Sequence, residues 1–283
     1  SVVNNRPVEE IVQEKLKYSP ASNYPTKLRD MAFNLLRTND SIIQIEYIRA
    51  DKKYNKVLKT YASNEINIYS NYFNTDTCFK LIDKDIAYLN NGSLKRKYLP
   101  EIWKSIEQTK GLIIDNRNYP SDFPRNELSS YLMPDSIQFV KITNGSIETP
   151  GLFAFERTNY VGKENKNYYK GKVVILVNEF TQSSSEYHAM AYRVHPNAIV
   201  IGSITAGADG NISQLYLPGG ISTMISGNGI YYPDGRETQR IGIVSDIEVR
   251  PTILGLMSGQ DEVLNKAIEI IRNGKKVDNQ KLK

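Results

Sequence analysis

Three consecutive serines, Ser183 to Ser185, lie where a buried strand is expected to pass into a helix. Residues 173–177 are all aliphatic, which is typical of a strand covered on both faces in a parallel sheet. Residues 186–193 then combine helix formers with apolar residues at helical spacing. The first N–H groups of a helix are unpaired and its dipole favours negative charge, so a serine there is suited to nucleophilic attack beside an oxyanion site.

The same residues also fit a purely structural role. Thr181, Ser183 and Ser184 are candidates for the helix N-cap, and Glu186 stands three residues after Ser183, where it would complete a capping box. Capping residues are ordinary at helix starts. The local pattern alone therefore favours the capping role over the catalytic one.

Two further loops follow expected buried strands, where ligands bind in open α/β sheets. The polar loop 116–121 follows the aliphatic strand 111–115, and the loop 205–211, which is rich in small residues, follows the strand 198–202. Small residues permit close approach of the backbone to a ligand. An ordinary turn and a plain flexible loop are equally consistent with these two segments.

The remaining pattern divides the chain into a small α+β unit, a linker and a larger α/β domain. Helices over 7–17 and from about residue 25, then strands over 41–49 and 57–61, make up the first unit. From residue 78 strands and helices alternate. The further elements expected there are a hairpin over 79–82 and 86–89, a helix over 100–108, a strand over 136–143, an irregular excursion over 144–170, paired strands over 214–217 and 222–226, and a helix over 261–272.

Composition excludes several classes of protein. With 40% hydrophobic and 24% charged residues the chain is globular, and no apolar run is long enough to span a membrane. The net charge of +5 is spread along the sequence, so nucleic-acid binding is not favoured. The single Cys78 and the two histidines, His188 and His195, do not have the number or spacing of metal ligands, and we expect no metal and no cofactor.

The stretches 112–118, 176–178, 181–186 and 242–247 together resemble the tail-specific, or C-terminal-processing, serine protease family, in particular its tricorn-core-like branch. The resemblance implies an α/β, crotonase/ClpP-like core domain over 78–283. It implies a partial PDZ-like unit over 1–62, joined to the core by a linker over 63–77. Because the chain enters the PDZ-like unit partway through, we expect further sequence upstream.

The resemblance also assigns roles to single residues. In the family the nucleophile stands three residues before the helix glutamate, which selects Ser183. The N–H of Ser184 would be one oxyanion donor, and Ser121 matches the position of the second. Many members use a lysine as the base, but Ala208 stands at the matching position. The tricorn-like branch uses an upstream histidine, assisted by an acidic residue whose position matches Gln239.

Two functions follow from the resemblance. One is a serine endopeptidase that hydrolyses bonds in extended peptide or unfolded protein tails, located in the periplasm or cell envelope. The other is a catalytically inactive peptide-binding relative. His188 stands five residues after Ser183, roughly on the opposite side of a helix, and is not favoured as the base. Since a serine hydroxyl is a weak nucleophile without a base, we expect little peptidase activity from this chain alone.

Overall fold

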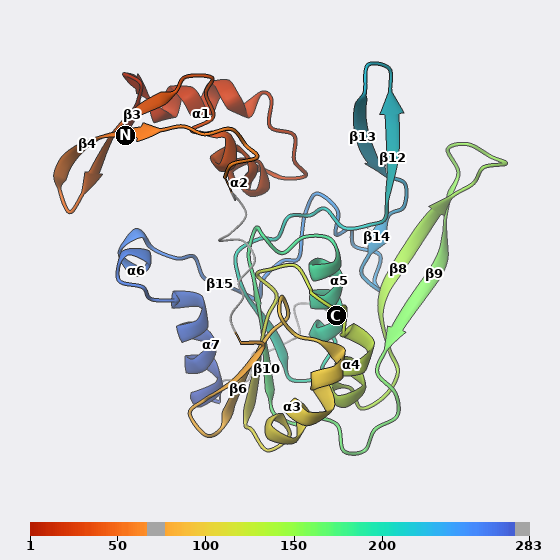
Figure 1. The fold of residues 1–283 in the computed structure, drawn as a ribbon. Helices are drawn as coiled ribbons and strands as arrows, with labels where there is room; N and C mark the ends of the chain where they lie inside the picture. The colour runs from red at the N-terminus through yellow and green to blue at the C-terminus, as the bar shows by residue number, and fades with distance from the viewer. Residues whose placement is uncertain (67–76, 275–283) are drawn as a thin grey trace. The chain divides into compact units, whose positions relative to one another are not determined.

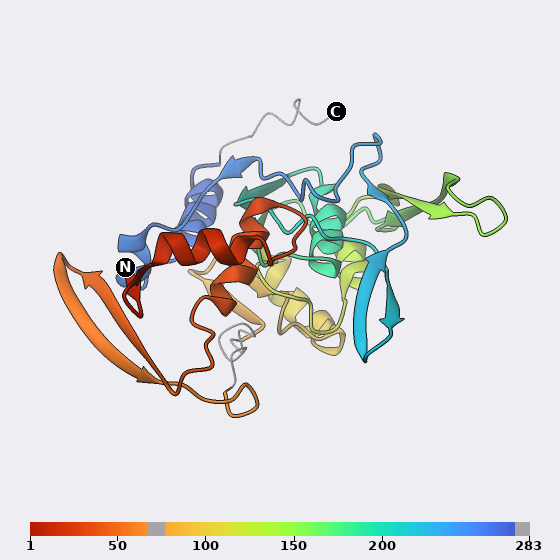
Figure 2. The same cartoon turned by 90° about the horizontal axis from the view of Figure 1, so that it is seen from above.

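The computed structural model describes residues 1–66 and 77–274, so most of the predicted linker lies outside the described residues. The chain divides into two compact units, Ser1–Phe73 and Asn74–Lys283. Figures 1 and 2 show both units, which are treated separately below. Within the described residues, no helix has the length and apolar character needed to cross a membrane.

The first unit is a four-stranded antiparallel sheet with two helices. The strands follow the order β2-β1-β3-β4, and β3 and β4 form a hairpin paired along its whole length. Its small core includes Ile11, Met31 and Ile43. The PDZ-like assignment of this unit stays a prediction. The elements are β1 Val2–Val3, β2 Arg6–Pro7, α1 Val8–Leu16, α2 Tyr24–Asn34, β3 Ile42–Arg49 and β4 Lys52–Lys59.

The second unit is built on a six-stranded sheet with the order β15-β11-β10-β7-β6-β5. Every neighbouring pair is parallel except β5 with β6, which form the expected hairpin. β7 and β10 lie side by side in the centre and every residue of β7 is buried, as their uninterrupted apolar runs predict. The strands are β5 Phe79–Ile82, β6 Ile86–Asn90, β7 Gly111–Asp115, β10 Lys172–Val177, β11 Ala198–Gly202 and β15 Ile247–Glu248.

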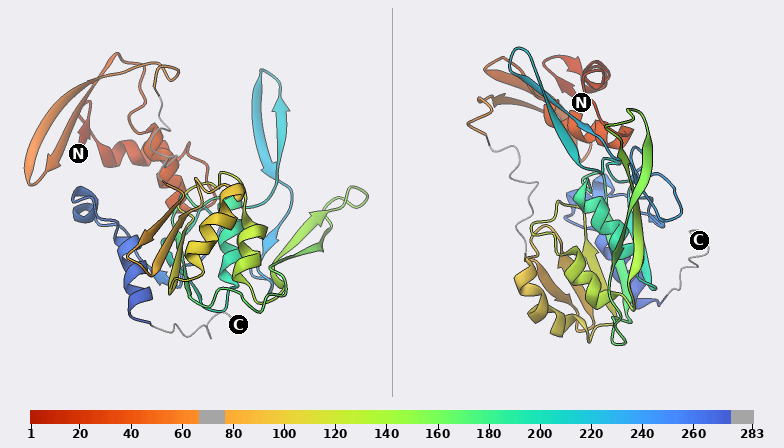
Figure 3. Two further views of the ribbon diagram at one scale, coloured as in Figure 1. Left: turned by 60° about the horizontal axis from the view of Figure 1, so that its bottom comes forward. Right: turned by 90° about the vertical axis from the view of Figure 1, so that its right-hand side faces the viewer.

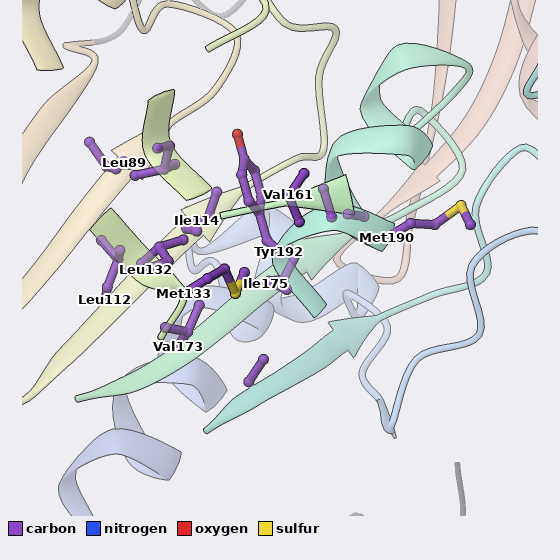
Figure 4. Packing of buried hydrophobic residues seen from close by; sticks show 14 of the residues in the cluster. Leu89, Leu112, Ile114, Leu132, Met133, Val161, Val173, Ile175, Met190 and Tyr192 are labelled. Carbon is purple, nitrogen blue, oxygen red and sulfur yellow. The ribbon is translucent and has the colours of Figure 1, made fainter. Parts of the chain in front are cut away.

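Helices cover both faces of this sheet (Figures 1 and 3). Alternate residues of the central strands, such as Ile114 and Ile175, pack with Leu132 and Tyr192 from the helices on one face (Figure 4). The opposite residues, such as Ile113, pack under the C-terminal helix on the other face. The predicted α/β architecture is confirmed. The helices are η1 Arg96–Tyr98, α3 Leu99–Ile106, α4 Arg125–Leu132 and α5 Ser184–Arg193, then α6 Ile253–Met257 and α7 Glu262–Arg272.

The segment 144–170, predicted to be irregular, contains a strand instead. β8 (Ile137–Gly145) and β9 (Phe153–Val161) pair antiparallel, and β14 (Ile230–Tyr231) pairs with the other edge of β8. Most of β9 is exposed, so it lacks the alternation of buried and exposed side chains that identifies a strand. A second hairpin, β12 (Ile212–Leu217) with β13 (Ile221–Ser226), forms a sheet of its own as predicted (Figure 3).

Candidate active site

Ser183 lies in the turn between the central strand β10 and helix α5, at the carboxyl edge of the sheet. The turn is fixed to the neighbouring strand through Thr181, which is fully buried. Its hydroxyl accepts a hydrogen bond from the Asn178 N–H at 3.0 Å and donates one to the Asn116 carbonyl at 2.8 Å. The ends of β7 and β10 are thereby tied together just before the serines.

The backbone of Ser183 has a φ of 52° and a ψ of −119°, a region that residues other than glycine rarely occupy. Such a conformation costs on the order of 1–3 kcal/mol and persists only where the surrounding structure enforces it. Sequence reasoning missed this strain because no residue type signals it. Strained residues cluster at active sites, where the strain holds a reacting group in place.

The three serines differ in their surroundings. The Ser185 hydroxyl is fully buried and donates to the Asn116 carbonyl at 2.8 Å, so it is not available for reaction. Ser184 is the first helical residue, and its N–H donates to no acceptor among the described residues. The half-buried side chain of Ser183 faces the Glu186 N–H in a capping box, yet makes no hydrogen bond of ordinary geometry with it. The predicted capping box is therefore present, and the role of Ser183 as nucleophile stays a prediction.

Glu186 binds the nucleophile turn to the loop after β11. Its carboxylate is buried and accepts four hydrogen bonds, from the Ser183 N–H (3.1 Å), the Thr205 hydroxyl (2.5 Å), the Gly207 N–H (2.8 Å) and the Ala208 N–H (3.0 Å). Burial raises the pKa of this carboxyl above its ordinary value, while the four donors act in the opposite direction. The carboxylate thus positions Ser183 against the loop 205–208.

Asp209, in the same loop, was not singled out by the sequence. It is 7% exposed; its Oδ1 accepts from the Gly210 N–H at 2.7 Å, and its Oδ2 has no partner within the described part of the chain. Burial, and next the nearby charge of Glu186, raise the pKa of Asp209 to about 7. A strongly shifted carboxyl in a loop that is bound to the nucleophile turn through Glu186 is a functional-site signal that only the tertiary structure reveals.

Gln239 is held by backbone groups at both ends of its amide. Its Nε2 donates to the carbonyls of Asp209 (2.7 Å) and Asn228 (3.0 Å), and its Oε1 accepts from the Ile230 N–H at 3.3 Å. These bonds fasten the loop 205–211 to the start of β14. A longer bond runs from the same Nε2 to the Ser226 hydroxyl at 3.4 Å, but no hydrogen bond joins Gln239 to Ser183 or to a histidine within the residues that the structure describes.

Ser121 is bound to a neighbouring segment rather than to Ser183. Its N–H donates to the Asn91 carbonyl at 3.3 Å and its hydroxyl donates to the Leu94 carbonyl at 2.9 Å. Service as the second oxyanion donor would require the N–H to give up its present acceptor.

Both histidines are buried, and their contacts are with groups other than the Ser183 hydroxyl. His188 Nδ1 lies 3.2 Å from Asn91 Nδ2, and burial, followed by the charge of Arg125, lowers the pKa of this imidazole to about 3. His195 Nε2 lies 2.9 Å from the Tyr169 carbonyl, and burial lowers its pKa to about 4. No histidine or lysine hydrogen-bonds Ser183 in the described ranges, and no cluster of three or more His, Cys, Asp or Glu side chains there is arranged to hold a metal.

Comparison with known proteins places the chain in a family. The sequence model of peptidase family S41 matches residues 85–249, more than half of the chain. The structure resembles a candidate peptidase from Parabacteroides merdae ATCC 43184, with a TM-score of 0.60 and 19% identity over 93% of this chain and 88% of that one. It resembles mature CPAF with a TM-score of 0.75 and 12% identity over 98% and 77%. No curated protein matches the sequence. At these identities the structures show the fold alone, and the sequence match shows the family: this chain belongs to peptidase family S41.

Proposed function

We propose that the protein is a serine endopeptidase that cleaves extended peptide or unfolded protein tails, with Ser183 as the nucleophile. The Ser183 hydroxyl attacks the scissile carbonyl while a histidine upstream of the described residues takes its proton, and the carbonyl oxygen becomes an oxyanion that the Ser184 N–H stabilises. Collapse of this intermediate breaks the C–N bond, the histidine gives the proton to the leaving amine, and the remaining acyl-enzyme is hydrolysed by water with the same histidine as base. On family resemblance we assign this work to the periplasm or cell envelope, with the PDZ-like unit binding the tail.

The observation that carries this proposal is the strained backbone of Ser183. A helix cap needs no positive φ, since capping residues ordinarily have extended backbones. The backbone of Ser183 departs from the helical path, while the Glu186 carboxylate accepts from the Ser183 N–H and the Thr181 hydroxyl donates to the Asn116 carbonyl. A strand-to-helix turn of this kind is the arrangement that presents a serine hydroxyl in other hydrolases.

A catalytically inactive peptide-binding relative is the second candidate. The absence of a base beside Ser183 among the described residues favours it, because Ala208 has no ionisable group and both histidines are buried elsewhere. The two functions differ in whether the Ser183 hydroxyl reacts with an electrophile.

Chemical rescue distinguishes the two functions. The chain is treated with a fluorophosphonate probe, with and without added imidazole as an external base. We expect slow labelling that imidazole accelerates, that maps to Ser183, and that Ser183→Ala abolishes while Ser184→Ala does not. Peptide binding without any labelling, even in imidazole, would support the binding relative. Labelling that persists in Ser183→Ala would show that the nucleophile is assigned wrongly.

A further inference from the structure

Tyr187 lies one helical turn after Ser183 on the same side of α5. Its N–H donates to the Ser183 carbonyl at 3.0 Å. Side chains on a helix lean toward its N-terminus, so the half-buried ring leans toward the nucleophile turn. The ring packs edge-on against Phe139, with centroids 4.9 Å apart.

Two side chains that each carry donor groups without an acceptor among the described residues meet at this ring. The Arg125 guanidinium stacks on Tyr187 at 4.6 Å from the ring centroid. It forms no ion pair with any carboxylate whose side chain the structure describes, and its Nε bonds only the neighbouring Asn126 Oδ1, at 3.2 Å. The Tyr187 hydroxyl accepts from Asn159 Nδ2 at 2.5 Å, which leaves its own proton free to be donated.

We propose that Arg125 and Tyr187 form a subsite that binds a carboxylate of the peptide substrate, close to the bond that Ser183 attacks. A guanidinium held on an aromatic ring keeps its N–H edges free for the two oxygens of a carboxylate, and such charge-assisted bonds are the strong ones. The carboxylate is either an Asp or Glu side chain or the free C-terminus of the tail. This inference rests on the proposed peptidase function and adds that the preferred substrate carries a carboxylate near the cleaved bond.

Four peptides of one neutral sequence test the subsite. One carries a single Glu and an amidated C-terminus, one replaces that Glu by Gln, one has Gln with a free C-terminal carboxylate, and one has both carboxylates. Binding to the Ser183→Ala chain is measured by fluorescence anisotropy, so that no peptide is consumed. We expect at least one carboxylate to tighten binding about tenfold or more, the size of one good charge-assisted pair. Which peptide gains shows whether a side chain or the C-terminus supplies the group.

Three further substitutions assign the gain to named residues. Arg125→Met should abolish the preference for the carboxylate, and Tyr187→Phe, which removes one hydroxyl, should reduce it in part. Arg236→Met is the matched control, because Arg236 also stacks on a tyrosine, Tyr232, at 5.3 Å but is already paired with Asp234. Its preference should equal that of the parent. Equal binding of charged and neutral peptides would overturn the subsite alone, whereas failure of every peptide to bind would also count against the proposed function.

Discussion

Replacing Ser183 by glycine should make the core unit more stable than replacing it by alanine. Both substitutions remove the hydroxyl, but only glycine adopts a φ of 52° and a ψ of −119° without steric cost. Relief of the strain is worth on the order of 1–3 kcal/mol. The greater conformational freedom of glycine in the unfolded chain lowers the free energy of unfolding by roughly 0.5–1 kcal/mol. We therefore expect Ser183→Gly to exceed Ser183→Ala by about 1 kcal/mol in free energy of unfolding.

The single tryptophan of the chain makes this difference measurable in the core unit alone. Trp103 is 7% exposed and stacks on Tyr131 with ring centroids 4.6 Å apart, so its fluorescence reports unfolding of the unit that contains Ser183. With a slope of roughly 2–3 kcal/mol per molar urea, the expected difference moves the midpoint by about 0.3–0.5 M. Neither variant should show peptidase activity.

Ser184→Gly is the matched control for this comparison. Ser184 occupies the first helical position, where glycine is expected to lower stability by up to about 1 kcal/mol. Opposite signs at adjacent serines would show that the effect comes from the backbone angle and not from glycine itself. If Ser183→Gly is no more stable than Ser183→Ala while Ser184→Gly behaves as expected, the turn is not strained. The strained backbone would then no longer support the assignment of Ser183 as the nucleophile.

Three more substitutions test the surroundings of the site with the same fluorescence assay. Glu186→Gln should lower the free energy of unfolding by roughly 2–4 kcal/mol, because the NH₂ group of glutamine would face buried N–H donors. A loss below about 0.5 kcal/mol would contradict the role given to the carboxylate. The pKa of Asp209 is about 7, above its ordinary 3.8, so its neutral form stabilises the fold at low pH and this contribution is lost as pH rises through 7. The stability of Asp209→Asn relative to the parent should thus rise by roughly 2–4 kcal/mol between about pH 5 and about pH 8, and a constant difference would refute the shift. Gly202→Ala would place a Cβ 1.9 Å from the Val177 carbonyl oxygen and should strongly destabilise the core. Gly219 also has a positive φ but lies in open surroundings, so Gly219→Ala should cost far less. Equal losses of stability would contradict this explanation.

The central sheet could be predicted from the sequence because its signal is local. Residues 111–115 and 173–177 are uninterrupted apolar runs, and only a strand covered on both faces accommodates such a run. β9 gave no comparable signal, since both of its faces are largely exposed and its identity as a strand comes from pairing with β8. Periodicity reports burial, so an exposed strand held by a partner strand does not stand out.

The candidate site could be predicted from the sequence only in part, because most of its contacts are not local in the sequence. The three-residue spacing between Ser183 and Glu186 predicts the contact that the structure shows between the Ser183 N–H and the Glu186 carboxylate. The other acceptors and donors come from distant positions: the Ser121 N–H binds the carbonyl of Asn91, and Asp209 is buried by segments that approach only in the folded chain. No spacing in the sequence encodes those contacts.

The order of the three serines explains why the proposed nucleophile cannot simply move along the chain. The Ser185 hydroxyl donates to the Asn116 carbonyl and so ties the start of α5 to the end of β7. Ser184 is the first helical residue, so its N–H has no acceptor within the helix. The Ser183 position alone departs from the helical path, and Glu186 enforces that departure by binding its N–H. In the Ser183→Ala chain, fluorophosphonate labelling in the presence of imidazole should therefore not move to the Ser184 hydroxyl, even though that hydroxyl lies one residue away. Labelling of Ser184 in that variant would show that the backbone conformation at residue 183 does not select which serine reacts.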